Sequence, residues 1–263
     1  MNYHYGIIYN GGKNMTSGIK SGYPTQEEMK NLEKYIAREP NKDTKSLEKD
    51  SMQWIRTSWE NKLSYEVNWL GIPIIQTAED IVIFQELIYN IQPDVIIETG
   101  IAHGGSLIFY ASIMNLIGKG RVIGVDIDIR EHNKILIQKH PMFERIEMIE
   151  ASSVDFNTIN LIRSKIKPGE KVVVILDSNH TIDHVYQELN LYQQFVSSGS
   201  YIVVCDTIMP DLAGLKPAAS DISTNNARAG MNKFLAENSN FEVDLKYNKL
   251  YVTNHPRGFL KRT

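Results

Sequence analysis

Between residues 94 and 204, short apolar runs alternate with segments of helical periodicity, and this alternation constrains the fold more than any other feature. Strands are expected at residues 94–98, 121–125, 145–149, 171–176 and 201–204, with helices at 78–91, 106–117, 130–139, 156–165 and 180–196. The runs are continuous and rich in Val and Ile, which is typical of strands buried on both faces. Repeated strand–helix units predict right-handed parallel crossovers, and therefore an α/β fold with a doubly wound, mostly parallel sheet and helices on both faces.

The two ends of the chain differ from this central pattern. Two further strands are expected near residues 241–244 and 250–253, separated by a Lys-Tyr-Asn-Lys turn, so the chain should close with an antiparallel hairpin. The first 25 residues contain many Gly and Asn residues and predict a loop, and helices are expected at 25–38 and 46–62. We therefore expect residues 1–68 to form an N-terminal loop and helical appendage, and residues 69–263 to form the main domain.

The composition limits the classes of function. Lys and Arg number 28 and Asp and Glu 31, a net charge of −3, which weakens the case for nucleic-acid binding. Cys205 is the only cysteine, so an intrachain disulfide is excluded and a reducing compartment is indicated. The apolar runs are too short to span a bilayer, and the first residues lack the pattern of a signal peptide. We expect a cytoplasmic protein with no nucleic-acid partner and no membrane span.

In a doubly wound sheet, ligands bind outside the carboxyl ends of the strands, so the residues at those ends are the candidates for chemistry. The first strand ends at Glu98 and runs through Gly100 into a turn with Gly104 and Gly105. Such a glycine-rich turn lets the backbone approach a ligand and directs amide groups of the next helix toward it. The spacing does not match Gly-x-Gly-x-x-Gly, so the dinucleotide fingerprint is absent.

The second and third strand ends carry groups suited to a nucleoside. Asp126 could accept hydrogen bonds from both hydroxyls of a ribose, a geometry shared by nicotinamide and adenosyl cofactors, and it could equally serve a structural role in the turn. Ser152 and Ser153, followed by Asp155, suit the edge of an adenine and suit the start of a helix equally well.

The fourth and fifth strand ends carry Asp177 and Asp206. If these strands are neighbours, about 4.8 Å apart, the two carboxylates can converge on one hard cation such as Mg²⁺ or Mn²⁺. His180 follows Asp177 by three residues and could act as a base near neutral pH. His180 and His184 have the spacing of a zinc-protease motif, but Thr181 stands where that motif needs glutamate.

Three segments resemble one known family: IETGIAHGGS (residues 97–106), LDSNHTIDH (residues 176–184), and WLGIP (residues 69–73) with Gln76. The chain resembles the cephalosporin hydroxylase/rhamnosyl O-methyltransferase family of class I S-adenosylmethionine-dependent methyltransferases. It is similar to the metal-dependent macrolide-sugar O-methyltransferases. The resemblance implies a Rossmann-like sheet of seven strands with a C-terminal antiparallel hairpin, a pocket for S-adenosylmethionine and a divalent metal, Mg or Mn.

The resemblance also implies site residues. Those expected at the cofactor are Gln76, Glu98, Thr99, Gly100, Gly104, Gly105, Ser106, Asp126, Ser152, Ser153 and Asp177. Glu98 and the glycine backbone would hold the methionine end, Asp126 would hold the ribose, and the two serines would flank the adenine.

The expected metal ligands are Asp177, Asp206 and Cys205, and His180 with Asp177 would be catalytic. Relatives carry glutamate immediately before the second metal-binding aspartate, where this chain has Cys205. A thiol is a poor ligand for Mg²⁺. The site therefore has one charged ligand fewer, recruits another group, or binds a softer metal such as Mn²⁺.

The expected reaction is metal-assisted methyl transfer to a sugar hydroxyl, with a nucleotide-activated or surface-polysaccharide sugar as acceptor and a homo-oligomer as the assembly. A nicotinamide-dependent oxidoreductase is an alternative, although its fingerprint is missing. A metal-dependent hydroxylase is another, since His180, His184 and Asp177 could imitate a facial triad on iron. A catalytically inactive binding protein is a third, for which Cys205 is the hint.

Overall fold

The computed structural model describes residues 27–28, 30 and 44–263. The elements described next all belong to the compact unit Thr44–Thr263. The loop expected at residues 1–25, and most of the helix expected at 25–38, lie outside the described residues. The compact unit includes helix α2 (Thr44–Glu60), which the sequence assigned to the appendage, so the boundary at residue 69 stays a prediction.

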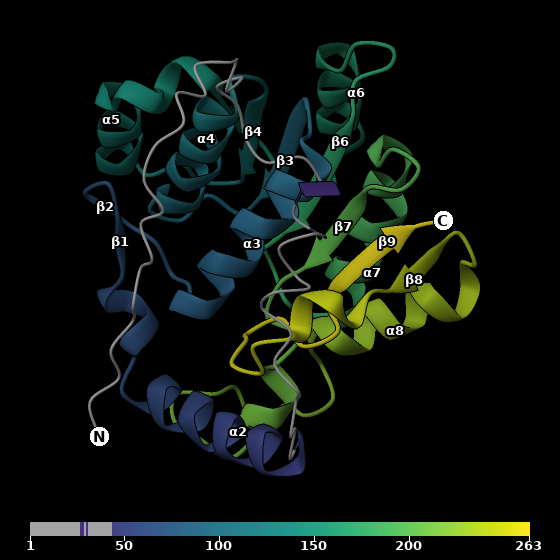
Figure 1. Cartoon of the computed structure of the whole chain (residues 1–263). Helices are drawn as coiled ribbons and strands as arrows, with labels where there is room; N and C mark the ends of the chain where they lie inside the picture. Colours follow the sequence, from purple (N-terminus) through teal and green to yellow (C-terminus); the bar gives the residue numbers. More distant parts are fainter. Residues whose placement is uncertain (1–26, 29, 31–43) are drawn as a thin grey trace, which may run out of the picture. The chain divides into compact units, whose positions relative to one another are not determined.

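The described residues form one large sheet of seven strands (Figure 1). Its order is β5 (Ile146–Glu150), β4 (Arg121–Asp126), β3 (Val95–Thr99), β6 (Val172–Leu176), β7 (Tyr201–Val204), β9 (Phe259–Arg262) and β8 (Phe241–Val243). The strands from β5 to β7 are parallel, and β9 runs antiparallel to both of its neighbours. The predicted fold class is therefore confirmed, including the antiparallel hairpin.

Helices cover both faces of the sheet (Figure 1). One layer contains α3 (Ala78–Ile91), α4 (Gly105–Ile117) and α5 (Glu131–Lys139), and the other contains α6 (Phe156–Lys165), α7 (Ile182–Tyr192) and α8 (Ala227–Glu237). Successive strand residues alternate between the layers: Ile96 packs with the first and Ile97 with the second, and both are fully buried. Each such side chain stabilises the fold by roughly 1.5–3 kcal/mol.

The expected strand at residues 250–253 is wrong. A 3-10 helix (Leu245–Asn248) follows β8, Leu250 is exposed, and Tyr251 has a positive φ of 64°, which a strand does not allow. The last strand is β9, where Phe259 packs into one helix layer and Leu260 into the other. In the sheet, β9 lies between β7 and β8, in agreement with its burial on both faces. The hairpin consists of β8 and β9, and the connection between them is longer than the four-residue turn that the sequence predicted.

Two smaller features border the sheet. A short ladder pairs β1 (Asn68–Trp69) with β2 (Ile72–Pro73), and Ile55 of α2 packs against Ile208 and Leu212. No helix among the described residues has the length and apolar character needed to cross a bilayer.

The order of the strands reverses between β3 and β6. From β3 the chain moves outward through β4 to β5 and then returns to β6 on the other side of β3. The backbone N–H of Asp177 donates to the carbonyl of Thr99 at 2.9 Å, so the two strand ends lie side by side. Ligands of doubly wound sheets bind at such a reversal, which places the candidate site here.

Candidate functional site

The turn after β3 depends on its glycines. Gly100 has a φ of +87°, and a Cβ at this position would lie 2.1 Å from the carbonyl oxygen of Asp177. A Cβ on Gly105 would lie 2.2 Å from the carbonyl oxygen of Pro73. Gly104, with a φ of +89°, precedes the first turn of α4. Only glycine lets the backbone pass this close, so the expected glycine-rich turn into a helix is present.

Asp126, at the end of β4, is hydrogen-bonded to the backbone of this turn. Its Oδ2 accepts a hydrogen bond from the N–H of Ile101 at 2.7 Å, and its Oδ1 accepts one from the N–H of Asp128 at 3.1 Å. The same side chain borders a cavity of about 430 Å³, the serine cavity, whose lining includes Gly100, Asp126, Ser152, Ser153, Ser178 and His184. The structure thus brings together the three residues expected at a nucleoside.

Glu98 and Thr99 lie beneath the turn and are not among the residues that line the serine cavity, because their strand is central and covered on both faces. The Glu98 carboxylate accepts a hydrogen bond from the Ser106 hydroxyl at 2.7 Å, while its other oxygen is buried without a partner. Burial raises the pKa of Glu98 to about 8. Glu98 is therefore one hydrogen bond away from the cavity that Ser106 lines.

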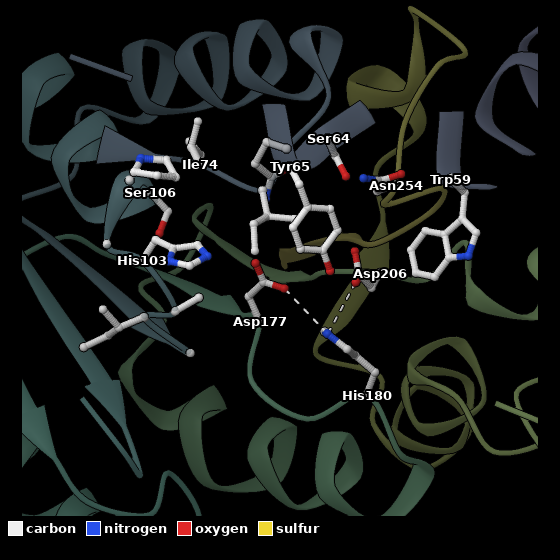
Figure 2. Close-up of a pocket in the computed structure, with 18 of the residues that line it drawn as sticks. Trp59, Ser64, Tyr65, Ile74, His103, Ser106, Asp177, His180, Asp206 and Asn254 are labelled. Atoms are coloured by element: carbon white, nitrogen blue, oxygen red, sulfur yellow. Dashed lines mark ion pairs between the residues drawn. The ribbon is translucent and has the colours of Figure 1, made fainter. Parts of the chain in front are cut away.

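On the other side of Gly100 lies a second cavity of about 290 Å³, the aspartate cavity, which Asp177, His180 and Asp206 line together (Figure 2). The Nε2 atom of His180 lies 3.4 Å from Oδ2 of Asp206 and 3.9 Å from Oδ1 of Asp177. Burial, reinforced by the neighbouring Asp206 charge, raises the pKa of Asp177 well above its usual range. The convergence of the fourth and fifth strand ends predicted from the sequence is confirmed in geometry.

This group suits a divalent cation. One potential ligand atom from each of Asp177, His180 and Asp206 lies within 4.8 Å of the others. Carboxylate oxygens are the ligands of Mg²⁺ and Mn²⁺, and an imidazole nitrogen suits the softer of the two. A cation here would also offset the repulsion between the two carboxylates.

The structure does not bring Cys205 into this group. Strand side chains alternate, so Val204 faces the layer of α7 and α8 and Cys205 packs with α3 and α4, fully buried. Burial raises the pKa of its thiol well above the usual range. His184 is also separate from the group: its Nε2 lies 3.2 Å from Ser153 Oγ and 3.1 Å from Ser178 Oγ, in the serine cavity. The facial triad of the hydroxylase alternative is therefore not assembled.

Several residues at the aspartate cavity are not among the site residues predicted from the sequence. Gln76 was expected and lines it, but Trp59, Ser64, Tyr65, His103 and Asn254 also line it. His255 lies buried behind Asp206. These residues come from distant parts of the chain, and among those not expected only His103 lies in one of the three short segments that resemble the family.

Comparisons with known proteins agree on one family. A sequence model described as "Rhamnosyl O-methyltransferase/CmcI" matches residues 61–263. The rhamnosyl O-methyltransferase of Mycobacterium tuberculosis (strain ATCC 25618 / H37Rv) is 30% identical over 207 residues, covering 75% of this chain and 78% of that protein. The protein of the same name from Mycobacterium leprae (strain TN) is 29% identical over 165 residues, covering 62% of this chain and 69% of that protein.

Solved structures show the same fold. A CmcI structure described as an Mg-SAM form aligns with a TM-score of 0.56 at 17% identity, covering 76% of this chain and 77% of that one. An apo-structure of CmcI aligns with a TM-score of 0.55 at 19% identity, with the same coverage.

Proposed function

The chain belongs to the rhamnosyl O-methyltransferase/CmcI family and is an S-adenosylmethionine-dependent O-methyltransferase, and we propose that its acceptor is a sugar hydroxyl bound beside a divalent cation. The observation that carries the proposal is the position of Asp177, His180 and Asp206, across Gly100 from the serine cavity. The relatives' name supports a sugar acceptor, for which we propose a nucleotide-activated or surface-polysaccharide sugar.

In this proposal the two cavities bind different parts of the cofactor. Asp126, Ser152 and Ser153 suit the ribose and adenine of the cofactor, and Gly100 lines both cavities, so the cofactor can extend from one into the other. The amide groups at the start of α4, after Gly104, suit the carboxylate of its methionine part. When bound, the cofactor supplies a methyl group on a sulfonium centre.

His180 has the position of a general base. An alcohol is a weak nucleophile at neutral pH, so a group must take its proton as the new carbon–oxygen bond forms. Nε2 of His180 faces the aspartate cavity, and the two neighbouring carboxylates stabilise the imidazolium that forms. Asp177 and Asp206 would hold a cation there, which would stabilise negative charge on the acceptor oxygen.

The first part of the compact unit contributes to the acceptor side. Trp59, Ser64 and Tyr65 line the aspartate cavity together with Asp177 and Asp206 (Figure 2). We therefore assign acceptor selection to this region rather than to the sheet.

The test compares His180→Ala with His132→Ala, which removes an exposed histidine on α5. Methyl transfer is measured with radiolabelled cofactor against rhamnosides and sugar nucleotides, and binding of S-adenosylhomocysteine by calorimetry. His180→Ala should lose about 10²–10⁴-fold in turnover, the usual range for a general base, with unchanged binding. Full turnover in His180→Ala would refute the role of His180. Cofactor binding with no transfer to any sugar would refute the acceptor class.

A further inference from the structure

Asp206 has a backbone conformation that needs support. It lies two residues after the end of β7 and has a φ of +55°, the left-handed region that residues other than glycine adopt infrequently. The direction of its carboxylate, toward His180, depends on that conformation (Figure 2). The contacts of its backbone therefore bear on the geometry of the aspartate cavity.

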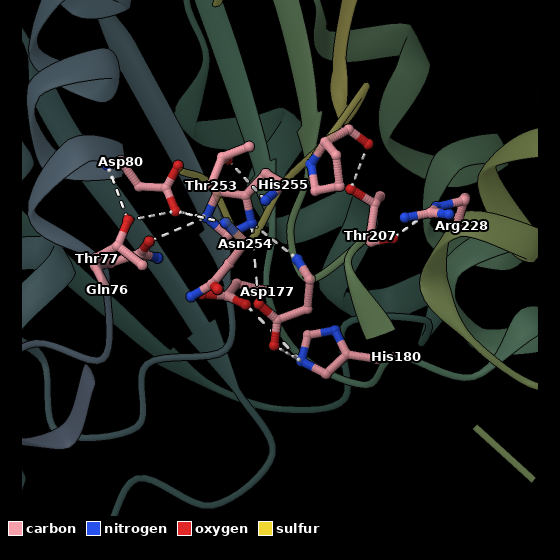
Figure 3. A network of polar contacts seen from close by, with 12 residues as sticks. Gln76, Thr77, Asp80, Asp177, His180, Thr207, Arg228, Thr253, Asn254 and His255 are labelled. Carbon is pink, nitrogen blue, oxygen red and sulfur yellow. Dashed lines mark hydrogen bonds and ion pairs between the residues drawn. The ribbon is translucent and has the colours of Figure 1, made fainter. Parts of the chain in front are cut away.

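The N–H of Asp206 donates to Nδ1 of His255 at 2.9 Å. His255 is fully buried, and its Nε2 lies 3.0 Å from Oε1 of Gln76 (Figure 3). Because Nδ1 accepts a hydrogen bond, the ring proton is on Nε2 and is donated to Gln76. The imidazole thus connects the end of β7 with the segment before α3.

A buried carboxylate favours the same tautomer. Oδ2 of Asp80, in the first turn of α3, lies 3.8 Å from Nε2 of His255 and is fully buried. It accepts hydrogen bonds from the Thr77 hydroxyl at 2.9 Å and from the N–H of Asn254 at 2.8 Å. Its negative charge favours a proton on the facing nitrogen of the ring. Oδ1 of Asp206 lies 3.9 Å from Nδ1 and favours the opposite tautomer, but this carboxylate is partly exposed and more strongly screened by solvent than Asp80. Nδ1 is therefore left free to accept from the N–H of Asp206.

The loop that carries His255 is fastened against β7. The Thr207 hydroxyl donates to the carbonyl of Pro256 at 2.8 Å, and the N–H of Val204 donates to the carbonyl of Gly258 at 2.8 Å. A Cβ on Gly258 would lie 2.2 Å from the carbonyl oxygen of Val204, so the close approach requires glycine. The position of His255 is consequently fixed by backbone as well as by side chains.

We propose that His255 is a positioning residue, which holds Asp206 in the left-handed conformation that directs its carboxylate toward Asp177 and His180. Gln76 and Asp80 keep the ring in the tautomer that can accept from Asp206. The inference rests on the proposed cation role of Asp206, and it adds a residue that lies outside the three short segments from which the site was inferred in the sequence.

Two substitutions at position 255 distinguish the role of Nδ1 from that of Nε2. His255→Asn keeps an acceptor close to the position of Nδ1, whereas His255→Gln places its amide close to Nε2 and leaves the N–H of Asp206 without a partner. His132→Asn on exposed α5 is the control. Mn²⁺ affinity of the full chain is measured by electron paramagnetic resonance, and S-adenosylhomocysteine affinity by calorimetry.

His255→Gln should weaken Mn²⁺ binding by about 10–100-fold, the usual effect of losing a residue that orients a ligand, and His255→Asn should restore most of it. Binding of S-adenosylhomocysteine should be unchanged in both. Equal Mn²⁺ affinity of wild type and His255→Gln would overturn the positioning role alone. Absence of Mn²⁺ binding by the wild type would overturn the cation role and the inference with it.

A second measurement does not depend on the variants folding. Long-range proton–nitrogen spectra of the wild-type chain with labelled histidine report the tautomer of each ring. The spectra should show a proton on Nε2 of His255 and an unprotonated Nδ1 that accepts the hydrogen bond from Asp206. A proton on Nδ1 of His255 would contradict the hydrogen bond from Asp206 and overturn the proposal.

Discussion

Replacing Glu98 with glutamine should change how stability depends on pH. Burial raises the pKa of Glu98 from its ordinary value of 4.5 to about 8. Between these values the folded protein keeps a proton that the unfolded chain releases, so the free energy of unfolding falls as pH rises through this window. Each pH unit within it corresponds to about 1.4 kcal/mol. From pH 5 to pH 8, wild type should lose roughly 3.5 kcal/mol relative to Glu98→Gln.

The pH slope is the informative quantity. Glutamine can still accept the hydrogen bond from the Ser106 hydroxyl, but its amide brings donors into a buried place, which lowers stability equally at every pH. Urea unfolding followed by circular dichroism at several pH values gives the two curves, and Glu144→Gln, at an exposed position in the turn before β5, is the control for losing one carboxylate. Parallel curves for wild type and Glu98→Gln would refute a raised pKa at Glu98.

Three further predictions concern the turn, the nucleoside residues and the cation. Gly100→Ala should destabilise the protein by at least about 2 kcal/mol more than Gly118→Ala. Both glycines have φ near +88°, but only at position 100 would the added Cβ clash with neighbouring backbone atoms. Equal urea midpoints of the two variants would contradict this prediction. Asp126→Ala should weaken S-adenosylhomocysteine binding by about 10–100-fold in calorimetry, because the ligand loses hydrogen bonds to a charged group. Asp128→Ala, at an exposed position, should bind the ligand as wild type does. Unchanged affinity of Asp126→Ala would exclude a contact between Asp126 and the ligand. Exhaustive chelation should abolish methyl transfer, with recovery on adding Mg²⁺ or Mn²⁺; full activity of the metal-free protein would refute metal assistance.

The strand-end residues could be predicted because the rule behind them is topological. In a parallel sheet all carboxyl ends meet at one edge, so Asp126, Asp177 and Asp206 were expected together before any distance was known. Local periodicity also predicted α3 and α6 to the residue. These features depend on residues close together in the sequence and on the rule that the carboxyl ends of parallel strands meet at one edge of the sheet.

The remaining features depend on tertiary context. The runs at 250–253 and 259–262 are both short and β-prone, and only burial between two helix layers selects the second as a strand. Cys205 was expected at the metal because the resemblance to the family implies a ligand at that position, but strand alternation turns its side chain into the core. His255 and Asp80 are far apart in sequence and meet only because the C-terminal loop packs against the start of α3.

The most direct test is a crystal structure of the protein with S-adenosylhomocysteine and Mn²⁺, with anomalous scattering used to locate the metal. The adenosyl group should lie in the serine cavity beside Asp126 and Ser153, and a manganese peak should lie between the carboxylates of Asp177 and Asp206. An adenosyl group bound elsewhere, or manganese bound away from these two aspartates, would contradict the proposed site.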